Sequence, residues 1–132
     1  YKRQGHWVAH KLEQISDFRI GHGDAVAIGL AVDLTYSAKI GLIKKSSTER
    51  CLRLLEKLGF RLFDELLVTV SENQTEVILD GLEEFREHLG GELTITLIQG
   101  IGEGVEVHAM DKKKILDSVE DLRKREIALR KI

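Results

Sequence analysis

The sequence is poor in cysteine: Cys51 is the only one, so no internal disulfide can form. Such a lone thiol usually packs as a small hydrophobe, and the missing disulfide framework predicts a reducing compartment, the cytoplasm. Long apolar runs are also absent. No stretch approaches the ~20 apolar residues that span a bilayer, and no leader of charged, apolar and small segments opens the chain. We therefore expect no membrane partner.

Neither sign of charge dominates, since 20 basic residues stand against 22 acidic ones. This balance lacks the basic footprint of a nucleic-acid-binding protein, and we expect no nucleic-acid partner. A Gly-rich turn from a strand into a helix, followed by an acidic residue, is missing as well. The chain therefore has no dinucleotide-binding signature of its own. Its length suits one domain, residues 1–132, with a hydrophobic core.

Histidines supply the strongest functional signal. If residues 5–16 form a helix, His6, His10 and Glu13 stand at positions i, i+4 and i+7 and project from one face. His22 follows a turn, and a second helix that starts near Asp24 would hold its imidazole close to the first helix. Two interpretations are open at this point: histidines on a solvated helix surface, or nitrogen ligands that converge on a divalent cation.

The glycines on either side of His22 favour the metal site. Gly21 and Gly23 let the backbone come close to a ligand or to another helix, which a merely solvated histidine does not require. Neutral imidazole suits zinc, and also cobalt or iron in its place. The sequence therefore predicts a divalent metal at these histidines, with zinc preferred over cobalt.

Residues 5–13 and 22–29 resemble two motifs of one family. They read Gly-His-Trp-Val-Ala-His-Lys-Leu-Glu and His-Gly-Asp-Ala-Val-Ala-Ile-Gly. The C-terminal domain of 3-dehydroquinate synthase and its relatives, the sugar phosphate cyclases, carries the similar stretches Gly-His-x-x-Gly-His-x-x-Glu and His-Gly-Glu-Ala-Val-Ala-Ile-Gly. The eleven residues between His10 and His22 match the family's separation. Residues 93–97 and 100–102 look like the family's late hairpin before its last helix.

The resemblance implies a role for each matched residue. His6 and His22 correspond to zinc ligands, and His10 to a histidine of the substrate pocket, a catalytic group suited to proton transfer or to holding a phosphate. Glu13 either orients a ligand histidine without binding the metal itself or faces solvent. Asp24 occupies the position of the family's glutamate, and its carboxylate supports the site and can cap the following helix. The family's third ligand is a glutamate from a preceding segment, and no residue of this chain matches it.

Other positions depart from the family. Arg3 and Gln4 stand where the family has an asparagine that contacts substrate and an aromatic residue. An Asp-Lys-Lys run that supplies a substrate-binding lysine is replaced by Phe-Arg-Glu-His at 85–88. Arg86 or His88 is therefore expected to supply the cation that binds substrate. Because the planar fork of Arg differs from the point charge of Lys, these changes favour a divergent cyclase over a standard 3-dehydroquinate synthase.

The family's reaction combines NAD-dependent oxidation of a phosphorylated sugar acid with phosphate elimination, reduction and aldol ring closure. The resemblance implies a zinc- and NAD-dependent lyase that acts on a sugar phosphate and forms a homodimer. NAD would be held mainly by an N-terminal domain absent from this chain. Because the chain opens on Tyr1, close to the first motif, we expect a fragment or processed piece that is inactive alone.

Three hypotheses about function stay open. The first is the metal- and substrate-binding half of a 3-dehydroquinate synthase. The second is the same domain of a divergent cyclase that acts on another sugar phosphate. The third is a non-catalytic helical module that uses its surface for partners. Retention of all three histidines at the family's spacing argues against the third.

The hydrophobic pattern predicts a mainly α domain with one small β-hairpin before the last helix. We expect helices at 5–16, 24–42, 46–58 and 74–89, strands at 92–98 and 105–108, and a last helix that Asp111 caps. Residues 62–70 fit either a short helix or a strand. Ser46 and Glu49 read as a capping box for the third helix, and Gly59 as its stop.

The same pattern predicts which side chains form the core. The segment 24–42 is apolar almost all round and should be the buried central helix. The third helix should bury Leu52, Leu55 and Leu58, and the last helix should turn its stripe of Ile115, Val119 and Leu122 inward. Residues 123–130 are charged, and we interpret them as a solvated face rather than a binding patch.

Overall fold

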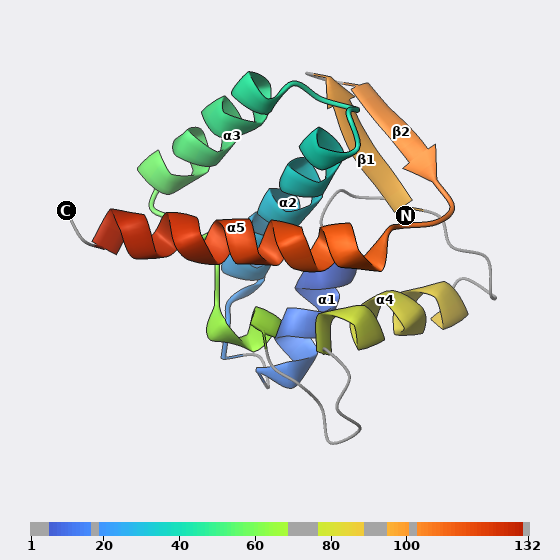
Figure 1. Ribbon diagram of the computed structural model, residues 1–132. Coiled ribbons are helices and arrows are strands. Elements are labelled where there is room, and N and C mark those ends of the chain that lie inside the picture. Colours follow the sequence, from blue (N-terminus) through green and yellow to red (C-terminus); the bar gives the residue numbers. More distant parts are fainter. Residues whose placement is uncertain (1–5, 17–18, 69–76, 89–94, 101–102, 131–132) are drawn as a thin grey trace.

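The computed structural model describes residues 6–16, 19–68, 77–88, 95–100 and 103–130. Its elements are mainly helices, with one hairpin before the last of them (Figure 1), which confirms the predicted fold class. In chain order they are α1 (His6–Ile15), α2 (His22–Lys39), α3 (Lys45–Lys57), the 3-10 turn η1 (Glu65–Val68), α4 (Val77–His88), β1 (Ile95–Gly100), β2 (Glu103–Val107) and α5 (Lys112–Arg130).

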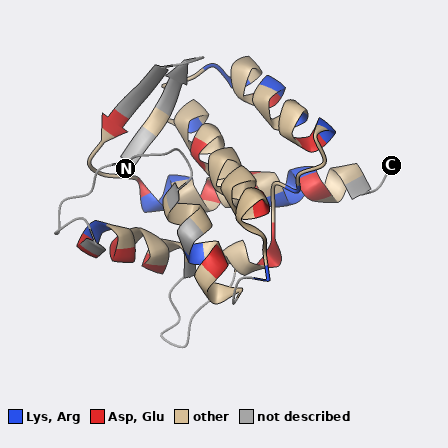
Figure 2. Cartoon of the chain, turned by 180° about the vertical axis from the view of Figure 1, so that it is seen from behind, with Lys and Arg blue, Asp and Glu red and all other residues tan. Residues whose placement is uncertain are grey.

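Helix α2 is the centre of the fold and contacts α1, α3, α5 and β1 (Figure 1). A helix that is apolar on every side must be enclosed by other elements, and most α2 side chains are buried, among them Ile28, Val32 and Leu34. Seen from behind, α3 and α5 carry charges of both signs (Figure 2). The predicted central helix is confirmed, although it begins two residues before Asp24 and ends at Lys39.

Glycine ends two of the helices. Gly59 has a positive φ of 98°, a left-handed conformation that residues with a Cβ rarely adopt. Its N–H donates to the carbonyl of Glu56 at 3.0 Å, and the N–H of Phe60 donates to that of Leu55 at 3.1 Å. This is the paired pattern of a Schellman motif. The predicted stop at Gly59 is confirmed, and Gly41 ends α2 with a φ of 81°.

Two predictions for α3 are wrong. The helix begins at Lys45 with Lys44 as its N-cap and no side-chain cap, so Ser46 lies inside the first turn and cannot form a capping box. Glu49 instead accepts hydrogen bonds from Arg53 and Arg125. Leu52 is buried as expected. Leu58 is 65% exposed, because it is the C-cap residue and the chain turns away there.

The hairpin pairs β1 with β2 in antiparallel register, with Leu97 opposite Val105 and a register shift between Ile98 and Gly100. The ends of both strands differ by one to three residues from the predicted ranges. Leu97 is fully buried, and β1 packs against α2. The ambiguous segment 62–70 contains η1. Helix α4 begins at Val77, and its predicted start at residue 74 lies outside the described residues.

The last helix follows its predicted pattern at the start and departs from it near the end. The carboxylate of Asp111 accepts a hydrogen bond from the N–H of Lys114 at 3.2 Å, which confirms the cap. The predicted inward stripe, Ile115, Val119 and Leu122, is buried. Arg125 contradicts the solvated-face interpretation, because its side chain is only 21% exposed and contacts Glu49 and Glu56 of α3.

Across the described ranges, every helix is too short or too polar to span a membrane. Cys51 carries a free thiol and is partly buried on α3.

Candidate functional site

The turn between α1 and α2 is organised by the buried side chain of Ser16. Its hydroxyl donates to the carbonyl of Glu13 at 3.3 Å and accepts from the N–H of Ile20 at 3.3 Å. The N–H of Arg19 donates to the Ser16 carbonyl at 3.1 Å. Gly21 then takes an extended conformation as the N-cap of α2. These bonds reverse the direction of the chain, so that His22, the first residue of α2, faces α1.

A buried polar contact holds the other end of α1 against α2. The indole Nε1–H of Trp7 donates to the carboxylate of Asp33 at 3.3 Å, and both residues are buried. The sequence analysis did not predict this link, although a carboxylate in the middle of an apolar helix is a signal for a buried polar partner. Trp7 follows His6 directly, so this bond holds the first turn of α1 in place.

Glu13 and His22 meet where α1 ends and α2 begins. The Nδ1 atom of His22 lies 2.7 Å from Oε1 of Glu13. The His22 side chain is 70% exposed, whereas that of Glu13 is 19% exposed. In a neutral imidazole, a hydrogen on Nδ1 that is donated to a carboxylate leaves Nε2 with a free lone pair. This is the arrangement in which histidines bind metals, and no described residue forms a hydrogen bond to Nε2.

His6 and His10 belong to the same helix as Glu13. His6 is the first residue of α1 and His10 lies one turn later, so the predicted i, i+4, i+7 register on one helix is present. The side chains of both histidines lie outside the described part of the structure. Within the described part, no three His, Cys, Asp or Glu side chains form a group that could hold a metal. His22 with Glu13 is therefore the described part of the predicted site.

Asp24 is exposed in the first turn of α2. A carboxylate there complements the helix dipole, but it does not cap the helix, because the N-cap is Gly21 and no side chain caps it. The prediction that Asp24 caps α2 is wrong for this reason. Arg61 lies near it: the pKa of Arg61 is raised chiefly by a hydrogen bond to Glu126, with a smaller contribution from Asp24.

Arg86 and His88 both belong to α4, and His88 is its last residue. Arg86 donates to Oε2 of Glu83 through Nη2 at 2.8 Å and Nε at 3.1 Å. This hydrogen bond is the main reason that the pKa of Arg86 is raised. The side chain of His88 lies outside the described part of the structure.

Helix α4 is attached to α1 by a contact that the sequence did not reveal. The stem of Lys11 passes over Gly81, where an added Cβ would lie 2.8 Å from Cγ of Lys11. The ammonium of Lys11 then reaches the carboxylate of Glu84, with distances of 2.9 and 3.1 Å to its two oxygens. A glycine inside a helix indicates such a close approach. This contact sets the position of the helix that carries Arg86 relative to the histidine helix.

The described residues suit a divalent metal such as zinc. His22 offers an imidazole at the surface, its ring is oriented by a carboxylate, and His6 and His10 are on the adjacent helix. Nitrogen donors of this kind bind zinc and cobalt well. One described ligand does not make a complete site, and the ligand expected from another segment stays a prediction.

Comparison with known proteins identifies relatives of this chain. A family model described as 3-dehydroquinate synthase C-terminal matches residues 4–81. The 2-epi-valiolone synthase of Stigmatella aurantiaca is 38% identical over 102 residues, which make up 76% of this chain and 24% of that protein. The 3-dehydroquinate synthase of Clostridium perfringens strain 13 is 33% identical over 101 residues, or 76% of this chain and 27% of that protein. The chain thus spans about a quarter of the length of these relatives.

A solved structure shows the same fold. It is ValA, the 2-epi-5-epi-valiolone synthase of Streptomyces hygroscopicus subsp. jinggangensis 5008, with NAD+ and Zn2+ bound. The two structures agree with a TM-score of 0.82 over 92% of this chain and 32% of that chain, at 21% identity. The family model matches more than half of the chain. This chain therefore belongs to the 3-dehydroquinate synthase family of sugar phosphate cyclases and has the fold of the family's helical C-terminal domain.

Proposed function

We propose that this chain is the metal- and substrate-binding half of an NAD-dependent sugar phosphate cyclase of the 3-dehydroquinate synthase type. The observation that carries the proposal is the 2.7 Å contact between Glu13 and His22. A carboxylate that accepts the Nδ1 hydrogen of a surface histidine prepares Nε2 as a ligand, and the partner helix carries His6 and His10 at the family's spacing.

Each residue has a proposed role. His6 and His22 hold the metal, and Glu13 keeps the His22 ring in the binding orientation. His10 transfers a proton or holds the substrate phosphate, tasks that suit a side chain whose pKa is ordinarily near neutrality. Zinc, when bound, would polarise the reacting carbon–oxygen group, and NAD would accept and return the hydride. Arg86 or His88 supplies the cation that binds the substrate's anionic group.

The remaining parts of the active site would come from outside this chain. NAD binds mainly to a separate N-terminal domain, and the third metal ligand comes from a segment before this domain. The complete enzyme would work as a homodimer in the cytoplasm. The chain's short coverage of its relatives supports this division, because it spans 24% and 27% of the two named above.

Zinc content tests the metal site. The protein is expressed from its complete reading frame as the parent and as His6→Ala and His22→Ala, with His108→Ala as a matched control from an exposed histidine beyond β2. We expect stoichiometric zinc in the parent and in His108→Ala, and loss of zinc in the other two variants. A folded parent without zinc would leave the non-catalytic interaction module as the better hypothesis.

A second candidate is a cyclase that acts on a different sugar phosphate, and Arg86 in place of the family's lysine favours it. Arg presents a planar fork and Lys a point charge, so the substrate's anionic group would be bound in a different geometry. The zinc-loaded enzyme is assayed with NAD for phosphate release from a phosphorylated sugar acid and from a neutral sugar phosphate. Turnover of the acid alone supports a 3-dehydroquinate synthase, and turnover of the neutral sugar phosphate supports the divergent cyclase.

A further inference from the structure

A cavity of about 630 Å3 lies between α2, α3 and α5. It is far from the proposed metal site: Thr35, the first α2 residue that lines it, lies thirteen positions after His22, or about 20 Å along the helix. Its volume is within the range of small-molecule sites, roughly 300–1,000 Å3. Ala38, Leu52 and Leu122 form its apolar lining.

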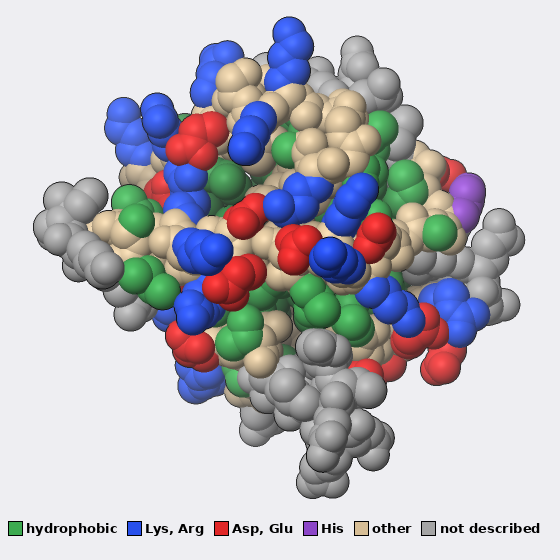
Figure 3. Space-filling view, viewed as in Figure 1, with side chains coloured by type: hydrophobic (Ala, Val, Ile, Leu, Met, Phe, Trp, Pro, Cys, Tyr) green, Lys and Arg blue, Asp and Glu red, His purple; other side chains and the backbone are tan. Residues whose placement is uncertain are grey.

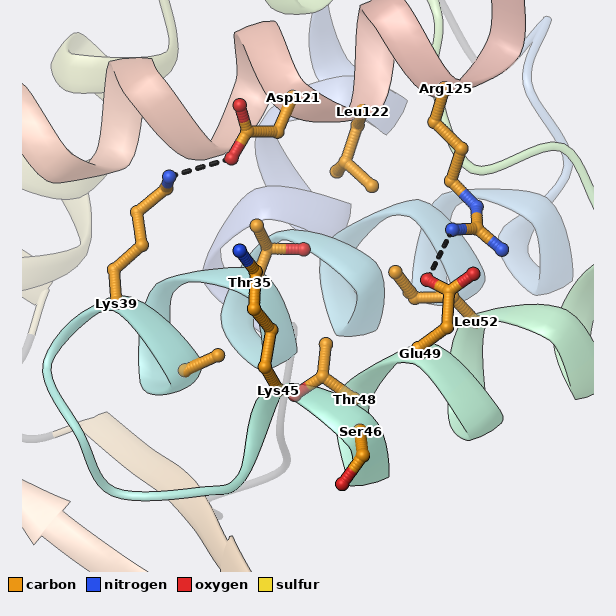
Figure 4. A pocket seen from close by; sticks show the side chains of 11 residues that line it. Thr35, Lys39, Lys45, Ser46, Thr48, Glu49, Leu52, Asp121, Leu122 and Arg125 are labelled. Atoms are coloured by element: carbon orange, nitrogen blue, oxygen red, sulfur yellow. Dashed lines mark hydrogen bonds and ion pairs between the residues drawn. The ribbon is translucent and has the colours of Figure 1, made fainter. Parts of the chain in front are cut away.

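Two ion pairs stand at the sides of the cavity (Figure 4). On one side, the ammonium of Lys39 lies 2.6 Å from the carboxylate of Asp121 and joins α2 to α5. On the other side, Arg125 donates to Glu49 at 2.5 Å and joins α5 to α3. Figure 3 shows the outer face of α5, where side chains of both signs lie next to one another. The charged side chains at the two sides of the cavity therefore largely neutralise one another.

Lys45 differs from the other cations that line the cavity. In Figure 4 its side chain points from the first turn of α3 toward α2, between the two ion pairs. Its ammonium has no acidic partner among the residues that the structure describes. A cation in the first turn of a helix lies at the positive end of the helix dipole. Helix α3 itself therefore does not stabilise the charge of Lys45. An anion in the cavity would compensate this charge.

We propose that this cavity binds a small organic anion, a carboxylate or a phosphate monoester, and that Lys45 recognises its charged group. The apolar lining would contact the body of the ligand. The hydroxyl of Thr35 donates to the carbonyl of Ala31 at 2.8 Å, which leaves its oxygen able to accept a hydrogen bond from the ligand. This inference does not depend on the proposed cyclase function.

Titration of the 15N-labelled protein, expressed from its complete reading frame and followed by two-dimensional NMR, tests the proposal. The probes are benzoate and phenyl phosphate, which share a ring and differ in the anionic group, with neutral benzamide as the uncharged control. We expect at least one of the two anions to shift the amide signals of residues 35–39, 45–52 and 121–125, and benzamide to shift them much less. Which anion binds more tightly identifies the charged group of the natural ligand.

Lys45→Ala and its neighbour Lys44→Ala form a matched pair, because both lysines are exposed and only Lys45 lines the cavity. We expect Lys45→Ala to weaken binding by about fivefold or more and Lys44→Ala to leave it unchanged. Lys45→Gln repeats the test with a longer polar side chain if the alanine variant folds poorly. Equal weakening in both lysine variants, shifts confined to α1 and the start of α2, or no shifts at millimolar anion would each overturn the proposal.

Discussion

Glu13 and His22 are nine positions apart in sequence, yet Oε1 of Glu13 and Nδ1 of His22 lie 2.7 Å apart. The contact spans the turn from α1 to α2, and it directs one ring nitrogen of an exposed histidine to a carboxylate. Since the other ring nitrogen is then the one that can bind a metal, this pair links the histidine pattern of the sequence to a testable geometry.

Glu13→Ala should lower the zinc affinity of the protein expressed from its complete reading frame by about 10–100-fold, because the His22 ring loses its orienting acceptor. Glu13→Gln keeps a hydrogen-bond acceptor without the charge, so its zinc affinity should lie between that of the parent and that of Glu13→Ala. Competition with a chromophoric chelator measures the affinity. Gln14→Ala, at the next and more exposed position, is the control. Unchanged affinity in Glu13→Ala would mean that the carboxylate does not support a metal ligand.

Arg125→Ala should lower the free energy of unfolding by about 1–2 kcal/mol. Arg125 donates to both oxygens of Glu56, at 2.7 and 2.8 Å, and to Glu49, so the substitution removes these hydrogen bonds between α5 and α3. Arg125→Lys should recover only part of the loss, because an ammonium cannot reproduce the bidentate geometry. Urea denaturation measures the effect. Arg123→Ala is the control, since Arg123 only approaches Glu120 at 3.7 Å on an exposed face, and its change should stay within about 0.5 kcal/mol.

The contribution of Arg125 should also depend on pH. The pKa of Glu49 is lowered, first by its hydrogen bond from Arg125. A carboxyl with a lowered pKa in the folded state stabilises the protein above its ordinary pKa of 4.5, and this contribution is lost as the pH falls through the folded-state value. The difference in unfolding free energy between the parent and Arg125→Ala should therefore be smaller at about pH 3 than at about pH 7. A difference that stays constant would assign the effect to packing of the Arg125 stem.

Gly81→Ala should destabilise the fold by about 1–2 kcal/mol, although alanine is the better helix former. Its Cβ would lie 2.8 Å from Cγ and 2.9 Å from Cβ of Lys11, and the second atom cannot move without a shift of α1. Gly23→Ala is the matched control, because its Cβ would meet only Phe60 Cε1 at 3.9 Å. Thermal unfolding should show a lower midpoint for the first variant and an equal or higher one for the second. The same response in both would show that α4 can move away from α1 at little cost.

Ser37→Ala should raise the free energy of unfolding by about 0.5–1 kcal/mol. The hydroxyl of Ser37 is fully buried and has no hydrogen-bond partner within the part of the chain that the structure describes. Ser118 offers a comparison at equal burial, because its hydroxyl donates to the carbonyl of Lys114 at 2.7 Å. Chemical denaturation should show a gain for Ser37→Ala and none for Ser118→Ala. A loss of stability in Ser37→Ala would indicate that its hydroxyl has a partner.

Features that depend on residues close together in the sequence were predictable. The apolar run of α2, the stop at Gly59, the cap at Asp111 and the inward stripe of α5 all follow from side-chain period or from the conformation that a glycine permits. The capping box at Ser46 was wrong because several starts of α3 satisfy the local pattern, and packing selected Lys45. Glu49, the second half of that pattern, is engaged by Arg125 from another helix.

By itself, the sequence determined the helical class of this protein and the spacing of His6, His10 and His22, because period and spacing are properties of consecutive residues. Only the tertiary structure decided which carboxylate meets His22, that Arg125 lies against α3 instead of in solvent, and that an open cavity lies between α2, α3 and α5. Arg125 and Glu56 are 69 positions apart. Contacts of this kind depend on how the helices pack, and side-chain type alone does not specify that packing.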